Sequence, residues 1–362
     1  MENNPHYRTA LVLQGGGALG AYEYGVMKAL YESRPQFKPA VVTGVSIGAI
    51  NAAVLVGAKE DPIRTLEHVW RHKFTALQAL PPPFNSVSEY LLLPEAQKCL
   101  ALLGNCGMYQ LRPEYLYAPL LATSVYDLAP LRETLAKVVD VDKLNRSHET
   151  RVVVSAVNVA TAELAPFDNQ EGFLSLDHII ASGSLPPYFP MTEIAGQYYW
   201  DGGLVSSMPL GPAINCLEQC EANDPEGRRE LIVVELFPRQ AKVPSNMTEV
   251  LSRAVQLRFT SKLTLDQRLF AKFNSFIDLI QKIDTVIPPS LREVRDHPAY
   301  KELSRRKRKI DAFTSITCNL PLERCNPLDF SKATIAQRIE AGYQDALDQE
   351  IGKYHPVPLG MS

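Results

Sequence analysis

TALVLQGGGALGAYEYGVMKALYE, residues 9–32, passes from an apolar run through three consecutive glycines into a helical pattern. Thr9–Leu13 is predicted to be a buried strand, because its apolar residues are almost unbroken. A helix is predicted from about Ala21 to Glu32, since Tyr22, Val26 and Leu30 recur at helical spacing. This strand, glycine loop and helix decide how the rest of the chain is interpreted.

The next segment repeats the same order. Ala40–Thr43 is predicted to be a short strand, residues 44–48 (GVSIG) a sharp turn, and Ile47–Gly57 an apolar, Ala-rich helix. Further on, Arg151–Asn158 and Leu231–Phe237 have the β-branched composition of buried strands. The alternation predicts an α/β fold, a parallel-rich central sheet sandwiched by helices.

Composition narrows the class of protein. The chain has 362 residues, 46% of them hydrophobic, which suits one large domain or one domain with an extension. A net charge of −3, with no basic stripe interleaved with aromatic residues, argues against a nucleic-acid partner. The longest apolar stretch, Ile47 to Ala58, is too short to span a bilayer.

The N-terminal sequence and the cysteines bear on the cellular compartment of the protein. The N-terminal sequence MENNPHYRTA has no apolar signal-peptide core, so a cytoplasmic protein is expected. The six cysteines form no C-x-x-C pair, which argues against a zinc site or a dithiol redox site and favours reduced thiols. No metal is predicted.

Two regions are predicted from shifts in composition. Residues 1–240 would form the main domain, with an apolar insertion at 78–128 that is either a set of short packed helices or a lid or acyl-chain wall. Residues 241–362 would form a mostly helical C-terminal extension, including a long amphipathic helix over 246–283 and a last helix over 331–349. ASGSLPPYFP (181–190) and the stretch from Tyr198 to Pro209 are expected to be loops.

The glycine loop has two interpretations. Gly15, Gly17 and Gly20 fit the G-x-G-x-x-G of a dinucleotide site. Such a site also needs an acidic residue about 20 positions further on, at the end of the second strand. That strand ends in Thr43 and Gly44, so the second half of the pattern is missing. No cofactor is therefore predicted, although a nucleotide-binding protein stays as an alternative.

The second strand instead leads into G-x-S-x-G, formed by Gly44, Ser46 and Gly48. A nucleophile at a tight strand-to-helix turn needs flanking glycines, because Cβ atoms would clash there. The N–H groups at the start of the following helix favour developing negative charge. Ser46 is thus a candidate nucleophile, the alternative being a structural helix cap.

An acyl-transfer site also needs donors for an oxyanion and a base for the serine. Gly15, Gly16 and Gly17 can present bare backbone N–H groups, or they form a simple tight turn. Asp201 in WDGGL is a candidate base whose apolar neighbours would raise its pKa, or else an Asx-turn residue. A Ser-Asp-His triad would require His297 or His355, the two histidines after Asp201.

Four motifs in this order, GGGALG, GVSIG, ASGSLPPYFP and DGG, resemble those of the patatin-like phospholipases over about residues 8–238. The resemblance implies a three-layer fold related to the α/β-hydrolases and a Ser-Asp dyad without histidine. By motif matching, Ser46 would be the nucleophile and Asp201 the base. The resemblance also assigns the oxyanion hole and the remaining motif glycines, namely Gly15, Gly16, Gly17 and the Ile47 N–H for the hole, and Gly20, Gly202 and Gly203 as motif positions. Ala18 stands where some members carry Arg or Lys.

The hypothesis from the sequence is a serine hydrolase of lipid carboxylic esters, of the phospholipase A or lysophospholipase type. A short-chain ester or thioester hydrolase is the alternative within enzymes, and a non-catalytic lipid-binding protein is one outside them. Peripheral membrane contact would use the insertion, the long helix or the basic run at 305–309. A core-packing face or a homodimer face explains the long helix equally well. Residues 240–362 resemble an extension found in some bacterial patatin-like proteins.

Overall fold

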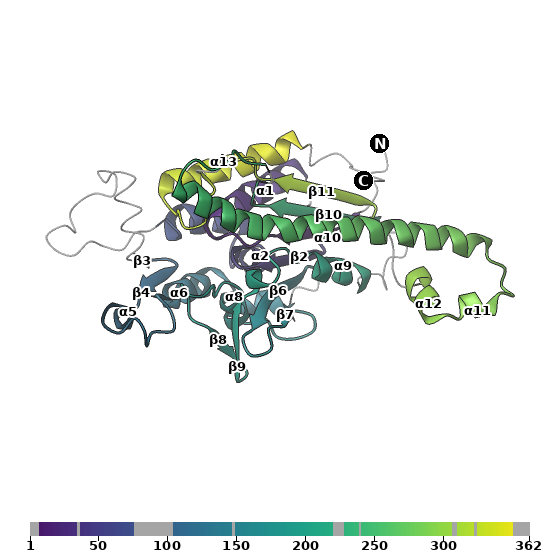
Figure 1. The fold of residues 1–362 in the computed structure, drawn as a ribbon, viewed down its shortest axis with the longest axis horizontal. Coiled ribbons are helices and arrows are strands. Elements are labelled where there is room, and N and C mark those ends of the chain that lie inside the picture. The colour runs from purple at the N-terminus through teal and green to yellow at the C-terminus, as the bar shows by residue number, and fades with distance from the viewer. Residues whose placement is uncertain are drawn as a thin grey trace.

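The computed structural model describes eight stretches of the chain: 7–34, 37–75, 104–146, 149–219, 228–238, 240–305, 310–321 and 324–349. Within them the main sheet has eight strands, with β7 paired to β6 beside the path β11-β10-β1-β2-β6-β9-β8 (Figure 1). The strands are β1 (Tyr7–Leu13), β2 (Val41–Val45), β6 (Arg151–Asn158), β7 (Leu164–Asp168), β8 (Thr192–Ile194), β9 (Gln197–Asp201), β10 (Arg228–Glu235) and β11 (Ala312–Thr317).

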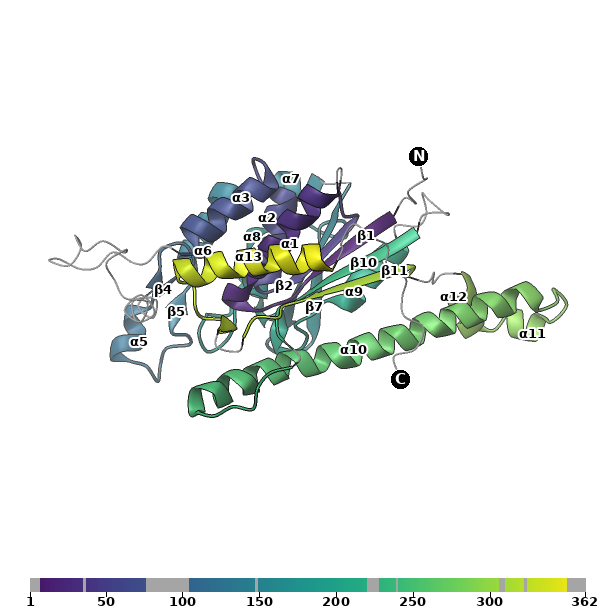
Figure 2. The same cartoon turned by 90° about the horizontal axis from the view of Figure 1, so that it is seen from above.

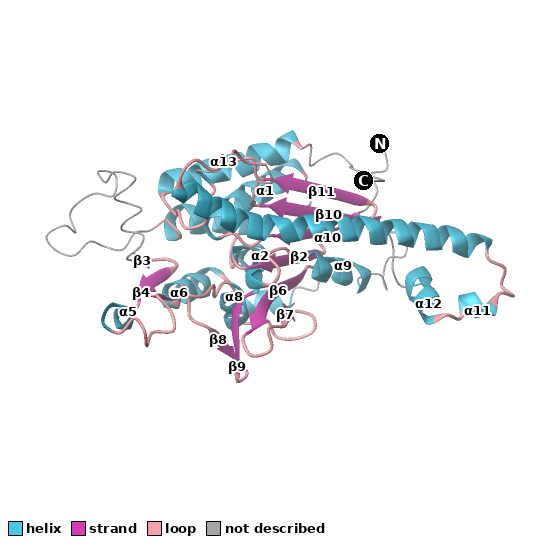
Figure 3. Cartoon of the chain, in the orientation of Figure 1, coloured by secondary structure: helices cyan, strands magenta, loops and turns pink. Residues whose placement is uncertain are grey.

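The five strands from β11 to β6 run parallel to one another, whereas β7 and β9 both pair antiparallel with β6. The predicted parallel-rich α/β sheet is therefore confirmed. Because β1, β2 and β6 are parallel neighbours, their carboxyl ends meet at one edge of the sheet. Figure 3 shows helices on the faces of this sheet. The loops that follow the parallel strands all open at that edge, where α/β proteins hold their functional groups.

Both faces of the sheet are buried, as the alternation along β1 demonstrates. Leu11 and Leu13 join the larger hydrophobic core, while Ala10 and Val12 join a second core on the opposite face. The larger core packs under α1 (Gly20–Ser33), α2 (Ile47–Gly57), α3 (Pro62–His68), α8 (Leu176–Ser182) and α13 (Lys332–Asp348); the second packs under α9 (Leu210–Gln219). Burial on both faces explains why the central strands read as continuous apolar runs.

The predicted insertion at 78–128 is only partly within the described residues, since 76–103 lie outside them. The interpretation as a set of short packed helices alone is wrong for the described residues 104–128. There β3 (Gly104–Asn105), β4 (Tyr109–Leu111) and β5 (Tyr126–Asp127) form a small antiparallel sheet, with α5 (Pro113–Tyr117) between β4 and β5. The stretch then continues into α6 (Ala129–Val138) and α7 (Val141–Arg146).

The C-terminal region is mostly helical, as predicted. It contains α10 (Met247–Val286), α11 (Arg292–Arg295) and α12 (Pro298–Arg305), followed by β11 and α13. The last two elements complete the main body: β11 pairs with β10, and α13 lies along α1 (Figure 2). The boundary at residue 240 stays a prediction, but the C-terminal region is structurally continuous with the sheet.

The long helix exposes several of its apolar residues. Leu269, Phe273 and Phe276 on α10 are each about half exposed. Core packing therefore does not explain these three residues, and the homodimer stays a prediction. No helix in the described stretches combines the length and the hydrophobicity needed to cross a bilayer.

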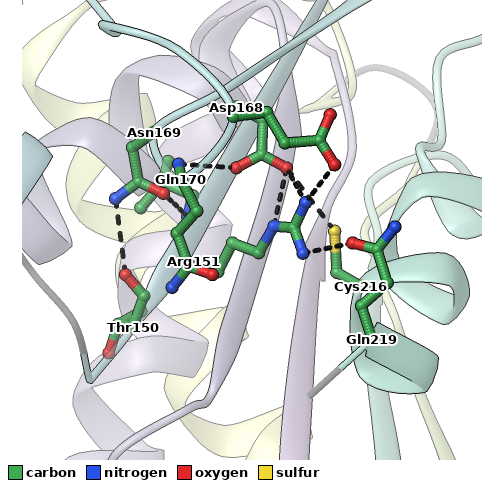
Figure 4. Close-up of polar contacts among 9 residues, drawn as sticks. Thr150, Arg151, Asp168, Asn169, Gln170, Cys216 and Gln219 are labelled. Atoms are coloured by element: carbon green, nitrogen blue, oxygen red, sulfur yellow. Dashed lines mark hydrogen bonds and ion pairs between the residues drawn. The ribbon is translucent and has the colours of Figure 1, made fainter.

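A buried ion pair fixes the amino end of β6, away from the edge where the parallel strands end (Figure 4). Arg151 is 5% exposed and donates to Asp168 on β7 at 2.6 Å. It also donates to Glu171 at 2.7 Å and to Gln219 on α9. Because the guanidinium reaches all three partners, it ties the β6–β7 pair to the helix on that face.

Candidate active site

Ser46 lies at a strained turn between β2 and α2. Its backbone has φ 56° and ψ −122°, a conformation that residues with a Cβ rarely adopt. A Cβ on Gly44 would lie 2.3 Å from the Gly48 carbonyl oxygen, and one on Gly48 would lie 2.5 Å from that of Leu13. Both flanking positions therefore require glycine, and the predicted strand, sharp turn and helix are present. The Ser46 residue is half-buried.

Two further serines support this turn. The Ser46 N–H donates to Ser182 Oγ at 2.9 Å, and Ser182 Oγ donates in turn to the Ser155 carbonyl oxygen on β6 at 2.7 Å. Ser182 belongs to the motif ASGSLPPYFP, to which the sequence assigned no catalytic atom. The motif therefore holds the backbone of the candidate nucleophile, a role that no spacing in the sequence indicates.

Asp201 is the last residue of β9, two strands away from β2. In the register of the sheet, Val45 is opposite Ser155, and the next residue of β6, Ala156, is opposite Asp201. The Asp201 N–H donates to the Ser184 carbonyl oxygen at 3.0 Å. The sequence predicts a loop from Tyr198 onward, which is wrong for residues 198–201, because Gln197–Asp201 forms strand β9 and its aromatic residues favour sheet.

Asp201 is 3% exposed, and its carboxylate accepts a hydrogen bond from the Gly203 N–H at 2.7 Å. The Ser46 side chain lies close enough to this carboxylate to stabilise its charged form. Burial raises the pKa of Asp201 to about 6, because the charged form loses its hydration. Ser46 and the Gly203 N–H act in the opposite direction and keep that pKa from rising further. A Cβ on Gly202 would lie 2.4 Å from the Ser155 carbonyl oxygen, so this position must be glycine for β9 to approach β6.

The glycine loop packs directly against the serine. A Cβ on Gly15 would lie 3.1 Å from Ser46 Cβ. However, the Gly15 N–H donates to the Ser207 carbonyl oxygen at 3.0 Å. The sequence predicts Gly15 as an oxyanion donor, and this prediction is wrong for the structure as it stands, because that N–H is already engaged.

The other predicted donors, unlike Gly15, have backbone N–H groups that are not engaged by any described residue. The N–H groups of Gly16, Gly17 and Ile47 have no acceptor among the described residues. Gly17 has φ 56°, in the left-handed region that favours glycine, and Ile47 opens α2. Gly20 serves helix packing, since a Cβ there would lie 2.4 Å from the Ile47 side chain. Within the described part of the chain, three of the predicted donors therefore keep a free N–H group.

An aromatic pair closes one side of the site. The rings of Phe237, after β10, and Phe259, on α10, stack with centroids 5.0 Å apart and planes 10° apart. A Cβ on Gly16 would lie 3.5 Å from Phe237, and one on Gly203 would lie 3.6 Å from Phe259 and 3.0 Å from Asp201 Oδ1. The pair therefore joins the glycine loop to the Asp201 turn and gives the site an apolar wall.

Histidine is not part of this arrangement in the described residues. His297 is exposed and lies between α11 and α12, at the end of the molecule away from the carboxyl ends of β10 and β11 (Figure 1). His355, the other triad candidate, lies outside the described residues. Among the described residues, the carboxylate of Asp201 is the titratable group whose pKa the Ser46 side chain lowers.

Together the strand order and the turn define a class: an α/β protein with a serine at a strand-to-helix elbow, a glycine loop beside it and a buried aspartate as partner. A family model for patatin-like phospholipase matches residues 11–214, more than half of the chain. The chain belongs to the patatin-like phospholipase family.

Curated relatives match over a short segment. Triacylglycerol lipase 4 of Saccharomyces cerevisiae is 43% identical over 68 residues, which are 18% of this chain and 7% of that protein. A patatin-like phospholipase domain-containing protein of Neurospora crassa is 40% identical over 70 residues, 19% of this chain and 8% of the relative. The matched segment thus spans less than a tenth of either relative.

Two solved structures are similar over most of the chain. VipD from Legionella pneumophila has a TM-score of 0.42 and 16% identity, covering 96% of this chain and 67% of that one. The type III effector protein ExoU has a TM-score of 0.37 and 15% identity, covering 96% and 53%.

Proposed function

We propose that the protein is a serine acyl hydrolase that cleaves carboxylic esters of lipids, with Ser46 as nucleophile and Asp201 as base. The observation that supports this proposal is the position of the Ser46 side chain next to the buried Asp201 carboxylate, whose charged form it stabilises. Membership of the patatin-like phospholipase family supports it. So do the names of the relatives, one of which is a triacylglycerol lipase.

In the proposed mechanism, Ser46 Oγ attacks the ester carbonyl carbon while its proton passes to Asp201. The N–H groups of Gly16, Gly17 and Ile47 stabilise the oxyanion that forms. Asp201 returns the proton to the departing alcohol, which leaves an acyl ester on Ser46. Water then gives a proton to Asp201 and attacks the acyl carbon, and the proton passes back to Ser46 as the fatty acid leaves.

The raised pKa of Asp201 suits this cycle. A general base works best when its pKa is near the working pH, since it must take up a proton and release it in each half of the reaction. An exposed aspartate, with a pKa near 3.9, would be a weak base for a serine hydroxyl. Burial raises the pKa of this carboxylate toward that of the imidazole that acts as the base in other serine hydrolases.

We propose a phospholipid or lysophospholipid as the substrate class. The stacked Phe237 and Phe259 offer apolar contact beside the reacting atoms, where an acyl chain would extend. Profiling p-nitrophenyl esters and lysophospholipids of graded chain length tests this: kcat/KM should rise with chain length. A maximum at two to four carbons would contradict it and favour a short-chain esterase.

We propose a lipid surface as the partner of the loop after α5. Leu120 and Leu121 are 98% and 86% exposed, and Leu116 and Tyr117 beside them are also exposed. This unit joins the site region, because the Tyr126 N–H donates to the Tyr188 carbonyl oxygen at 2.8 Å. Of the basic run at 305–309, residues 306–309 lie outside the described residues.

Liposome flotation tests the membrane contact. The double variant Leu120→Ser/Leu121→Ser should bind phosphatidylcholine vesicles more weakly than wild type, while hydrolysis of a soluble ester stays unchanged. Vesicle binding equal to that of wild type would remove this loop from the contact. Cytoplasmic location and dimer formation stay predictions.

Labelling by a fluorophosphonate probe tests the nucleophile. The wild-type protein should become covalently labelled, and Ser46→Ala should not. Ser206→Ala is the matched control, because this half-buried serine lies after the Asp201 turn and its hydroxyl donates to the Met208 carbonyl oxygen. Equal labelling of Ser46→Ala and wild type would overturn the proposed function.

A further inference from the structure

The loop between β11 and α13 touches the glycine loop, although the two lie at opposite ends of the sequence. The Pro327 carbonyl oxygen accepts the Ala18 N–H at 2.8 Å. A Cβ on Gly17 would lie 2.4 Å from the same oxygen. One carbonyl group therefore lies against the backbone at both residues.

A buried arginine holds the residues on either side of this proline. Arg338 on α13 is fully buried. Its guanidinium donates to three backbone carbonyl oxygens of the loop: Arg324 at 2.7 and 3.1 Å, Asn326 at 2.8 Å and Asp329 at 2.9 Å. The acceptors flank Pro327 on both sides, so the guanidinium sets the path of the chain through that residue.

Burying a guanidinium is costly, and the nearby charge of Asp329 offsets only part of that cost, since burial still lowers the pKa of Arg338. Here the neutral carbonyl groups of one loop satisfy the side chain, and the five donors of a planar guanidinium suit several acceptors at fixed positions. A lysine presents a single nitrogen and cannot reach all three carbonyl groups at once. The shape of the loop thus depends on an arginine in particular.

The frame that carries the arginine is rigid. Helix α13 approaches α1 so closely that a Cβ on Gly342 would lie 2.1 Å from the Tyr22 carbonyl oxygen. At the other end of the loop, Phe330 is 7% exposed and stacks in parallel with Trp70, with ring centroids 6.5 Å apart. Helix α1 follows the glycine loop directly, so Arg338 and the glycine loop share one support.

We infer that Arg338 is a positioning residue for the glycine loop, acting through the Pro327 carbonyl group. The C-terminal region, outside the matched residues 11–214, would then complete the proposed oxyanion site. The catalytic part of this inference rests on the proposed function. The structural part does not, because it concerns the exposure of the Ala18 amide. Arg338 touches no reacting atom, so its effect is expected in kcat and in the order of the loop.

The structural part is tested by hydrogen–deuterium exchange of the full-length chain. Arg338→Met keeps an apolar side chain of similar length and removes all the donors. The amide of Ala18 should then exchange at least about tenfold faster, while the core amides of α2 keep their protection. Arg338→Lys should give an intermediate rate, and it also serves as the test if the methionine variant does not fold.

The catalytic part is tested by steady-state kinetics on a soluble ester, at a temperature where circular dichroism shows each variant folded. A misplaced donor lowers kcat, so Arg338→Met should lose about 10- to 100-fold in kcat with KM within about twofold. Tyr343→Phe is the matched control: it removes the hydrogen bond from α13 to Glu32 on α1 without touching the loop. It should leave both kcat and the exchange rate of Ala18 unchanged.

The outcomes separate the two ideas. Unchanged exchange at Ala18 in folded Arg338→Met and Arg338→Lys overturns the inference. Faster exchange with unchanged kcat overturns its catalytic part. A wild-type protein without esterase activity contradicts the proposed function alone, since exchange at Ala18 still reports whether Arg338 holds the loop.

Discussion

The side chain of Ser46 lies beside the buried carboxylate of Asp201 and stabilises its charged form. The register of β6 makes this contact: Ser155 is opposite Val45 on one side, and Ala156 is opposite Asp201 on the other. A slip of one residue in the β6–β9 pairing would turn the Asp201 side chain to the opposite face of the sheet. The position of Asp201 next to Ser46 therefore depends on the strand register of the sheet as well as on the two residues.

Activity should depend on the protonation of Asp201. Its pKa is about 6, and a general base must be ionised to accept the serine proton. We expect kcat/KM for an uncharged ester to rise tenfold per pH unit below that value and to level off above it. Initial rates between pH 4.5 and 8 measure this. A flat profile between pH 5 and 7 would exclude Asp201 as the base.

Replacing the carboxylate should stabilise the fold at neutral pH. The pKa of Asp201 is raised above the value near 3.9 of an unfolded aspartate, so the folded state holds the extra proton between about pH 4 and 6. Its favourable contribution is complete below pH 4 and is lost as the pH rises through 6. Asp201→Asn should therefore raise the free energy of unfolding at pH 8 by on the order of 2 kcal/mol, as measured by urea titration, with little gain at pH 4.

The strained backbone of Ser46 should lower the stability of the fold, whereas its hydroxyl is needed for activity. With φ 56°, a glycine at this position would be free of Cβ strain, whereas an alanine would keep it. Both variants lose the hydroxyl, so both should lose turnover. Ser46→Gly should nevertheless be more stable to urea than Ser46→Ala by about 1 kcal/mol. The reverse order, which is usual for these two residues, would contradict a strained turn.

Ser182 should matter to the turn without touching the substrate. Ser182→Ala would leave the Ser46 N–H and the Ser155 carbonyl group without their partner, which costs about 1–3 kcal/mol of stability. We expect a lower melting temperature and a kcat lowered by roughly tenfold or more. Ser275→Ala on α10 is the control, because that serine is exposed and bonds only within its own helix. Equal kcat in both variants would remove Ser182 from the support of the nucleophile.

Gly17 should tolerate no side chain. In Gly17→Ala the methyl group would meet the Pro327 carbonyl oxygen, at a residue whose φ is already positive. The loop must then shift, and we expect kcat to fall about 100-fold, comparable to the loss of one oxyanion donor. Gly211→Ala, where nothing lies within 4 Å of the added methyl group, should leave kcat unchanged. Normal turnover in Gly17→Ala would indicate that its amide is not a donor.

The parts of the site that could be predicted from the sequence are those fixed by local rules. The strand, turn and helix around Ser46 follow from apolar runs broken by glycines at special backbone positions. The buried environment of Asp201 is indicated by its aromatic neighbours, Tyr199 and Trp200. These predictions need only a few consecutive residues, so the sequence carries them.

The features that could not be predicted depend on contacts between distant segments. The Gly15 N–H is engaged by the Ser207 carbonyl group, and the Ser46 N–H is held by Ser182. Strand β11 could not be predicted either. Its residues, AFTSIT, alternate in burial, and the strand joins the sheet only through its pairing with β10. Nothing in the local composition distinguishes these partners from other serines or other short strands.

The position of β10 has a practical consequence for anyone who expresses this protein in pieces. The matched residues end at 214, before β10, and β10 pairs with the whole length of β1. A fragment cut at that point would leave the backbone of β1, a central strand that ends in four apolar residues, open to pairing with neighbouring chains. Such a fragment would be expected to precipitate, and its inactivity would say nothing about Ser46.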